Sequence, residues 1–226
     1  GRIEALLDHL VQGHGYAKSP IDIACWDLLG QSCGQPLWML MGGKLTDGAP
    51  MYRVAPQKAT DETVAEMQRY REQGYRQFQI KVGSDWSGDI ERIQTGVSLL
   101  EPGEKAMADA NQGWRVDNAI RVARATADLD YILEQPCRTY EECQQVRRVA
   151  KQPMKLDECI TGMAAAQRVV ADKGAEICCL KLSNLGGLSK ARRVRDFLVE
   201  NRLPVVSEDT WGGEITTAAV AHFAAS

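Results

Sequence analysis

The sequence of 226 residues predicts an α/β protein of the (β/α)8 TIM-barrel class. Short apolar runs recur about every 25 residues, a spacing that accommodates one strand, one helix and two short loops. The intervening segments have the apolar periodicity of amphipathic helices. An open doubly wound sheet would show a glycine-rich turn after its first strand, but VAPQKATDE contains no glycine. We therefore expect a barrel.

Seven predicted strands follow one another along the chain. Each is a nearly continuous apolar run, as expected for parallel strands that are buried on both faces. The runs are PMYRVAP near residue 52, FQIKVG near 80, KAMADAN near 108, YILEQP near 133, MKLDEC near 156, ICCLKLS near 180 and PVVSED near 206. Helical patterns alternate with them, from DETVAEMQRYREQGY, which ends at Gly74, to the last segment, GEITTAAVAHFAAS. An eighth strand is not visible, and we expect it to be missing from this chain.

Residues 1–48 do not join this repeat, whereas 49–226 carry strands one to seven of the barrel domain. The segment SPIDIACWDLLGQSCG predicts a helix with Ser19 as its N-cap and Pro20 at its first position. Gly30 or Gly34 lies near its end, and the turn GQPLWMLMGG leads to the first strand. We expect a helical connector to a part of the protein that lies upstream.

Composition excludes several classes of function. The net charge is −3 and no basic run is present, which argues against nucleic-acid binding. No apolar stretch approaches the roughly 18–20 residues of a membrane span, so no membrane association is expected. The seven cysteines form no CxxC pair, which indicates reduced thiols and a cytoplasmic location. Only three histidines are present, which weakens any Ser-His-Asp or Cys-His interpretation.

Charged and polar residues gather where the predicted strands end, which is where a barrel of this class forms its active site. These residues are Lys81, Asp109, Asn111, Glu134, Asp157, Glu158, Lys181, Glu208 and Asp209. Three consecutive strands supply Asp109, Glu134 and Asp157. Neighbouring carboxylates repel one another and are tolerable only around a cation. Oxygen ligands select a hard ion, so we expect Mg²⁺, with Mn²⁺ as the second choice.

Lys81 and Lys181 end strands two and six, on opposite sides of an eight-stranded ring. One interpretation is that they only neutralise the negative charge of the carboxylates. The alternative is that they act as a base and an acid on either side of a metal-bound substrate. The reaction would then be proton abstraction from the carbon next to a carboxylate, with the metal stabilising the negative charge that develops.

The chain resembles the mandelate racemase/muconate lactonizing group of the enolase superfamily. The resemblance rests on YAKSPIDIACWDLLGQSCGQPLWMLMGG, KVG, ADAN, EQP, LDE, LKLSNLGGLSKA and ITTAAVAHFAA, which occur in the family's order over nearly the whole chain. It implies that Lys81 and Lys181 are the acid and base, and that Asp109, Glu134 and Asp157 bind the metal. Asn111 and Glu158 fall on positions that support the metal site.

The resemblance also implies an N-terminal capping domain, most of which we expect to be missing from this chain, with residues 1–48 as its connector. Two departures from the family pattern are visible. The family often has Lys-x-Lys on strand two, but here the first position is Gln79. Mandelate racemase has a histidine on strand seven, and this chain has none there. Both departures weigh against a hydroxyacid substrate of the mandelate type.

Within the group, FQIKVG, ILEQPC and SEDTWGGEITTAAVAH resemble members that act on proline derivatives. This implies a carbon-oxygen lyase that dehydrates cis-3-hydroxy-L-proline to a cyclic imine acid. Asp209 and Trp211 suit a cationic ring nitrogen, through an ion pair and a cation–π contact, and Tyr52 could line the same pocket. Asp209 and Trp211 could equally be a loop-capping aspartate and a packing tryptophan, and a tyrosine at the position of Tyr52 is more often a core residue.

Two alternatives remain open. An epimerase or racemase of proline betaine or another amino-acid derivative would need the same pair of lysines. A non-catalytic metal-binding barrel is the more distant alternative, because buried lysines without chemistry only cost stability. The expected partner is a small carboxylate substrate, and the expected assembly is a homo-oligomer.

Overall fold

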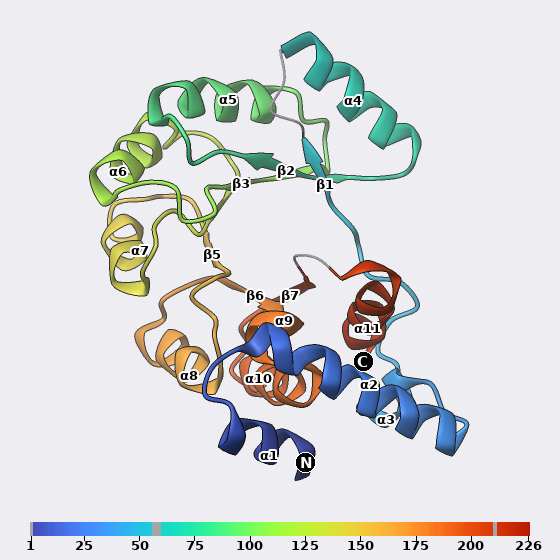
Figure 1. Cartoon of the computed structure of the whole chain (residues 1–226). Coiled ribbons are helices and arrows are strands. Elements are labelled where there is room, and N and C mark those ends of the chain that lie inside the picture. The colour runs from blue at the N-terminus through green and yellow to red at the C-terminus, as the bar shows by residue number, and fades with distance from the viewer. Residues whose placement is uncertain (1, 56–59, 210–211) are drawn as a thin grey trace. The chain divides into compact units, whose positions relative to one another are not determined.

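The computed structural model describes residues 2–55, 60–209 and 212–226. The chain divides into two compact units (Figure 1). Unit 1 consists of Gly1–Ala49, Ile160–Lys173 and Ile177–Ser226, and unit 2 consists of Pro50–Cys159 and Gly174–Glu176. Helices and strands alternate from residue 53 onward, so the predicted α/β class is confirmed.

Unit 2 contains five parallel strands that pair in chain order. They are β1 (Arg53–Ala55), β2 (Gln77–Lys81), β3 (Lys105–Asp109), β4 (Ile132–Glu134) and β5 (Met154–Leu156). Each overlaps a run that the sequence predicts to be a strand, and β2 begins one residue before its run. Strands β2 to β5 each bury apolar side chains, among them Phe78, Ala108, Leu133 and Leu156. Burial of this kind supplies the main driving force for folding the unit.

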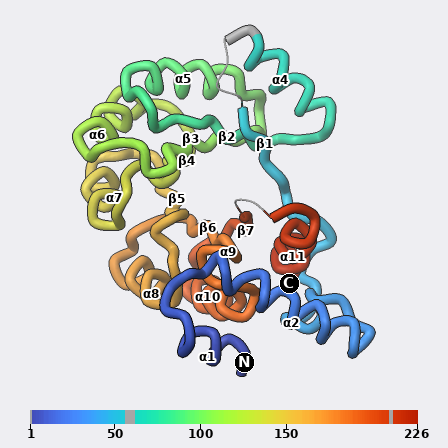
Figure 2. The backbone as a smooth tube through the Cα atoms, in the orientation of Figure 1, coloured from blue at the N-terminus to red at the C-terminus, as the bar shows by residue number. Residues whose placement is uncertain are grey.

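Four helices connect these strands (Figure 2). They are α4 (Thr60–Glu72), α5 (Trp86–Ser98), α6 (Val116–Ala125) and α7 (Tyr140–Arg147). Side-chain hydrogen bonds cap the N-terminal ends of two of these helices. The Asp85 side chain accepts hydrogen bonds from the backbone at the start of α5, and Thr139 forms a capping box with Glu142 at the start of α7. Helix α5 packs on α6, and α6 packs on α7.

Unit 1 contains the parallel pair β6 (Ile177–Lys181) and β7 (Val205–Glu208). Its helices are α1 (Arg2–Leu10), α2 (Gly15–Cys33), α3 (Leu37–Leu40), α8 (Met163–Asp172), α9 (Leu182–Leu185), α10 (Leu188–Glu200) and α11 (Gly213–Ala225). Helix α2 packs on α9, α10 and α11. The first segment of the chain therefore shares a core with the last two strand–helix units.

The predicted start of the α2 helix is wrong by five residues. The helix begins at Gly15 rather than after Ser19, and Pro20 lies inside it. Tertiary packing explains the difference, because Gly15 sits directly against the backbone of α9. A Cβ atom on Gly15 would lie 2.6 Å from the carbonyl oxygen of Ser183. The predicted end is confirmed, since Gly34 caps the helix in the left-handed conformation.

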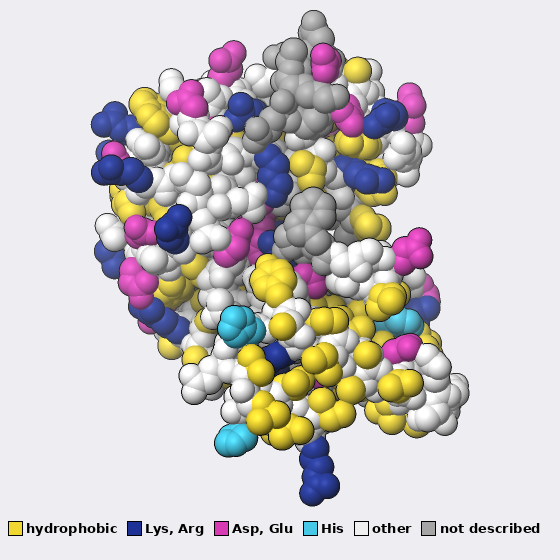
Figure 3. Space-filling model, viewed as in Figure 1, with side chains coloured by type: hydrophobic (Ala, Val, Ile, Leu, Met, Phe, Trp, Pro, Cys, Tyr) yellow, Lys and Arg dark blue, Asp and Glu magenta, His cyan; other side chains and the backbone are white. Residues whose placement is uncertain are grey.

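Helix α2 buries Ile23 together with the polar residues Lys18, Ser19 and Asp22, and it exposes several large apolar side chains. Its exposed large apolar side chains are Tyr16, Ile21, Leu28 and Leu29. Hydrophobic side chains gather on the face of unit 1 that Figure 3 displays. Grouped apolar side chains are typical of surfaces that contact another part of a protein or a partner. Within the described ranges, no helix has both the length and the apolar character needed to cross a membrane.

Candidate metal and proton-transfer site

The strand register of unit 2 lines up four charged residues across the sheet. Lys81 is the register partner of Asp109, Asp109 of Glu134, and Glu134 of Lys155. Register partners on neighbouring parallel strands carry their side chains on the same face. The sequence predicts the first three members of this row. The fourth, Lys155, is a charged residue that the sequence analysis missed.

Lys81 and Asp109 are directly bonded. The Lys81 Nζ atom donates to Oδ2 of Asp109 at 2.5 Å and to Oδ1 of Asn111 at 2.9 Å. Asn111 has a left-handed backbone, with φ of 42°, and its amide N–H donates to Oδ1 of Asp109 at 2.8 Å. Its side-chain amide donates to Oε1 of Glu158 at 3.1 Å. Asn111 therefore contacts the Asp109 carboxylate, and Glu158 contacts Asn111.

Glu134 is held from two sides. Its Oε1 atom lies 2.8 Å from the Nζ atom of Lys155, and both side chains are almost completely buried. The Gln79 amide donates to Oε2 of Glu134 at 3.0 Å. Strand β2 therefore supplies a neutral amide to Glu134, and strand β5 supplies the cation. The alternation of side chains along a strand could have identified Lys155, because it lies two residues before Asp157.

Asp157 follows β5 and is 1% exposed. One of its carboxylate oxygens lies within 4.8 Å of a carboxylate oxygen of Glu134. Oxygens that share an octahedral Mg²⁺ lie about 3 to 4 Å apart, because each is about 2.1 Å from the ion. Small side-chain movements would meet this requirement. The oxygens and the burial of Glu134 and Asp157 therefore fit a hard divalent cation, and the buried Asp109 offers a third carboxylate on the neighbouring strand.

Two glycines bring together the loops that follow Lys81 and Asp109. A Cβ atom on Gly83 would lie 2.2 Å from the carbonyl oxygen of Ala110, and one on Gly113 would lie 2.2 Å from that of Gly83. The buried Asp89 carboxylate secures these loops by accepting from Gly83 N at 2.8 Å and Trp114 Nε1 at 2.9 Å. This close packing explains the glycine in the KVG motif.

In unit 1, Lys181 ends β6 and is 7% exposed. Its register partner on β7 is Glu208, whose Oε1 atom lies 3.0 Å from the Sγ atom of Cys179. Asp209 accepts hydrogen bonds from Ser183, through the backbone N–H at 3.1 Å and through the hydroxyl. Asp209 therefore caps the short helix α9, which is the simpler of the two interpretations that the sequence allows.

The two other predicted substrate contacts are Tyr52 and Trp211. Tyr52 is half-buried, and the Nζ atom of Lys155 lies 5.6 Å from the centroid of its ring, within cation–π range. Tyr52 therefore contacts the charged row of unit 2. Trp211 lies outside the described residues.

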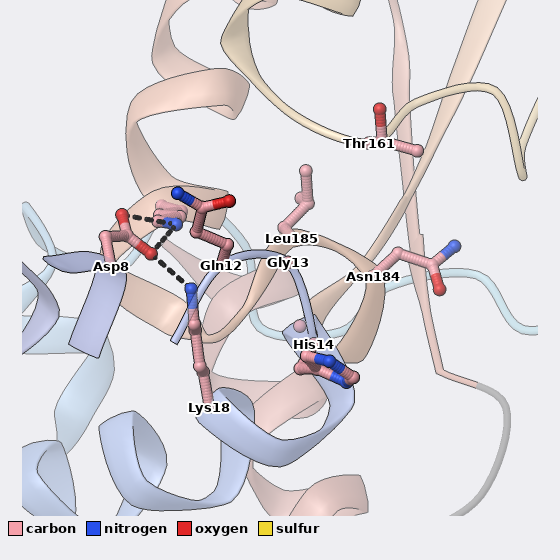
Figure 4. A pocket seen from close by; sticks show the side chains of 10 residues that line it. Asp8, Gln12, Gly13, His14, Lys18, Thr161, Asn184 and Leu185 are labelled. Atoms are coloured by element: carbon pink, nitrogen blue, oxygen red, sulfur yellow. Dashed lines mark hydrogen bonds and ion pairs between the residues drawn. The ribbon is translucent and has the colours of Figure 1, made fainter. Parts of the chain in front are cut away.

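A separate pocket of about 470 Å³ lies in unit 1 at the junction of α1 and α2 (Figure 4). Lys18 and Lys190 face Asp8 across it, each at 2.7 Å. Their hydrogen bonds lower the pKa of the Asp8 carboxyl. Of the residues that line the pocket, none is a predicted catalytic or metal-binding residue.

Comparison with known proteins places this site in a family. Residues 62–226 match the family described as "Enolase C-terminal domain-like". Residues 2–42 match the N-terminal domain of mandelate racemase / muconate lactonizing enzyme. The chain therefore belongs to the mandelate racemase/muconate lactonizing group of the enolase superfamily.

Individual relatives agree with this assignment. The chain is 45% identical over 226 residues to a cis-3-hydroxy-L-proline dehydratase of Roseibium aggregatum, covering 100% of this chain and 62% of the relative. A crystal structure of a mandelate racemase/muconate lactonizing enzyme from Roseovarius nubinhibens ISM is 77% identical, with a TM-score of 0.96, covering 99% of this chain and 62% of the other.

A second solved structure, of an enolase-superfamily member from the same organism complexed with magnesium, is 33% identical, with a TM-score of 0.91. The match covers 99% of this chain and 61% of the chain in that structure. The chain thus spans about 62% of the length of the curated relative.

Proposed function

We propose that the protein is a Mg²⁺-dependent dehydratase of cis-3-hydroxy-L-proline. The observation that carries this proposal is the 45% identity to the dehydratase of Roseibium aggregatum, which extends over the entire chain. The charged row of unit 2 supplies the chemistry that such a reaction needs. A carbon next to a carboxylate is weakly acidic, so its deprotonation requires positive charge nearby as well as a base.

Asp109, Glu134 and Asp157 would hold the metal. The magnesium complex of the related enolase-superfamily member supports the choice of ion. When bound, Mg²⁺ would supply positive charge at the substrate carboxylate. Asn111 would orient the Asp109 carboxylate through its backbone N–H, and Glu158 would orient Asn111.

Lys81 and Lys181 would carry out the proton transfer at the Cα atom of the substrate. One of the two amines, in its neutral form, removes the proton from the Cα atom of the substrate. The electron pair of that C–H bond forms a double bond to the neighbouring carbon, whose C–O bond breaks. The hydroxyl group takes up a proton and leaves as water. The resulting enamine acid then tautomerises to a cyclic imine acid.

We also propose that the strands β1 to β7 belong to a (β/α)8 barrel, and that the whole protein has an N-terminal capping domain in addition to this barrel. The match of residues 2–42 to the N-terminal domain of this family supports the proposal. In this arrangement residues 1–48 are the helical connector to that capping domain.

Incubation of the protein with Mg²⁺ and cis-3-hydroxy-L-proline in D₂O tests the function. We expect loss of water, detected by mass spectrometry of the imine product, and no product without the metal. Proline betaine serves as the comparison substrate. Deuterium incorporation at Cα without loss of water from any substrate would identify an epimerase, and no exchange at all would identify a binding protein.

A further inference from the structure

The buried residue Gln135 connects the ends of three strands in unit 2. It directly follows Glu134, and its side chain is 0% exposed. Its backbone N–H donates to the carbonyl oxygen of Lys155 at 3.0 Å. Its own carbonyl oxygen accepts from the N–H of Gln112, in the loop after β3, at 3.0 Å.

The side chain of Gln135 holds the segment that contains Asp157. Its Oε1 atom accepts from the backbone N–H of Asp157 at 2.9 Å and from that of Cys159 at 3.4 Å. Its Nε2 atom donates to the carbonyl oxygen of Cys137 at 2.9 Å. One amide group therefore ties the segment after β5 to the segment after β4.

The backbone of Gln135 is strained. Its φ is 34°, in the region that residues other than glycine rarely adopt. The next residue is Pro136, and a residue that precedes proline favours an extended conformation. Strain of this kind persists only where the surrounding contacts impose it, and it is typical of functional sites.

We infer that Gln135 is a positioning residue for the metal site. Its backbone conformation orients the adjacent Glu134, and its Oε1 atom fixes the backbone of Asp157. It thereby sets the distance between two carboxylates that lie on different strands. The inference rests on the metal site of the proposed function, but not on the identity of the substrate.

The substitution Gln135→Met tests the inference, because methionine has a similar length and cannot form these hydrogen bonds. Gln135→Asn is a milder second variant. Asparagine tolerates a positive φ, but its side chain is one methylene shorter and does not reach the Asp157 amide. The matched control is Gln152→Met. Gln152 is also buried in unit 2, and its amide donates to the carbonyl oxygen of Thr126 at 2.7 Å, just before β5 begins.

Two measurements are needed. Calorimetric titration with Mg²⁺ should give a Kd about 10- to 100-fold higher in the Gln135 variants than in the wild type. Hydrogen exchange in the metal-free protein should be about tenfold faster at the amides of Asp157 and Cys159. The Gln152 variant should lose thermal stability but keep the wild-type Mg²⁺ affinity.

Wild-type Mg²⁺ affinity in both Gln135 variants would overturn the inference and leave the proposed function intact. An equal loss of affinity in Gln152→Met would also overturn it, because the effect would then be one of general stability. A wild-type protein that binds no Mg²⁺ would overturn both proposals. Unchanged exchange at the two amides would show that Gln135 does not hold this segment.

Discussion

The Nζ atom of Lys81 lies 2.5 Å from the Oδ2 atom of Asp109. A proposed acid–base residue thus bonds to a proposed metal ligand. Register pairing of β2 with β3 produces this contact. A carboxylate has two oxygens, so Asp109 can accept from Lys81 through Oδ2 and still offer Oδ1 to a divalent ion.

We expect Lys81→Ala and Lys181→Ala each to lower kcat by several orders of magnitude, with little change in Mg²⁺ affinity, because both amines move the substrate proton. Steady-state kinetics and calorimetry check this. Lys105→Ala is a suitable control, since Lys105 is exposed at the start of β3. A tenfold loss of kcat corresponds to an increase of roughly 1.4 kcal/mol in the activation free energy. If a variant loses less than this, its lysine has a structural role.

Chelation of the metal with EDTA should abolish turnover, and added Mg²⁺ should restore it. Because the ion binds the folded state, Mg²⁺ at 100 times its Kd should stabilise the protein by about 2.7 kcal/mol. Thermal unfolding at several Mg²⁺ concentrations checks this. The variants Asp109→Asn, Glu134→Gln and Asp157→Asn should each lose most of the stabilisation. Full stabilisation in any one of them would remove that residue from the ligand set.

Lys155→Met should destabilise the metal-free protein strongly, by about 3–5 kcal/mol, because it removes the cation from a buried ion pair with Glu134. Urea unfolding in the presence of EDTA gives the free energy of unfolding. The double variant Lys155→Met/Glu134→Gln should recover part of the loss, since it leaves no uncompensated charge. A single variant as stable as the wild type would show that the pair contributes little.

Asp209→Asn should raise the KM for cis-3-hydroxy-L-proline more than Trp211→Ala does, if Asp209 accepts from the ring N–H groups. A proline betaine has no such donor, so the order should reverse for that substrate. The bond between Ser183 and Asp209 adds a control. If Asp209 only caps α9, then Ser183→Ala and Asp209→Asn should alter thermal stability and leave the KM values unchanged.

The cysteines should differ widely in reactivity. Burial raises the pKa of Cys137 and of Cys178 to about 12, whereas Cys33 is exposed. Only the thiolate reacts with disulfide reagents, so at pH 8 Cys33 should react before these two buried thiols, which should react only on unfolding. Mass spectrometry of peptides after addition of an aromatic disulfide gives the modification rate at each cysteine. Modification of Cys137 or Cys178 in the folded protein as fast as that of Cys33 would contradict the assignment.

The sequence by itself determined the α/β class, the positions of the seven strands and the residues at their ends, because a buried parallel strand needs a continuous apolar run. It also identified Asp109, Glu134 and Asp157 as candidate ligands, since carboxylates at the ends of such runs are costly unless they have a function.

Other features depend on contacts between residues far apart in the chain. Strand register paired Lys155 with Glu134, and close backbone packing of Gly15 on α9 moved the start of α2. The left-handed conformation of Gln135 arises in the same way. Its sequence neighbour Pro136 disfavours that conformation, and hydrogen bonds to the segments after β3 and β5 impose it.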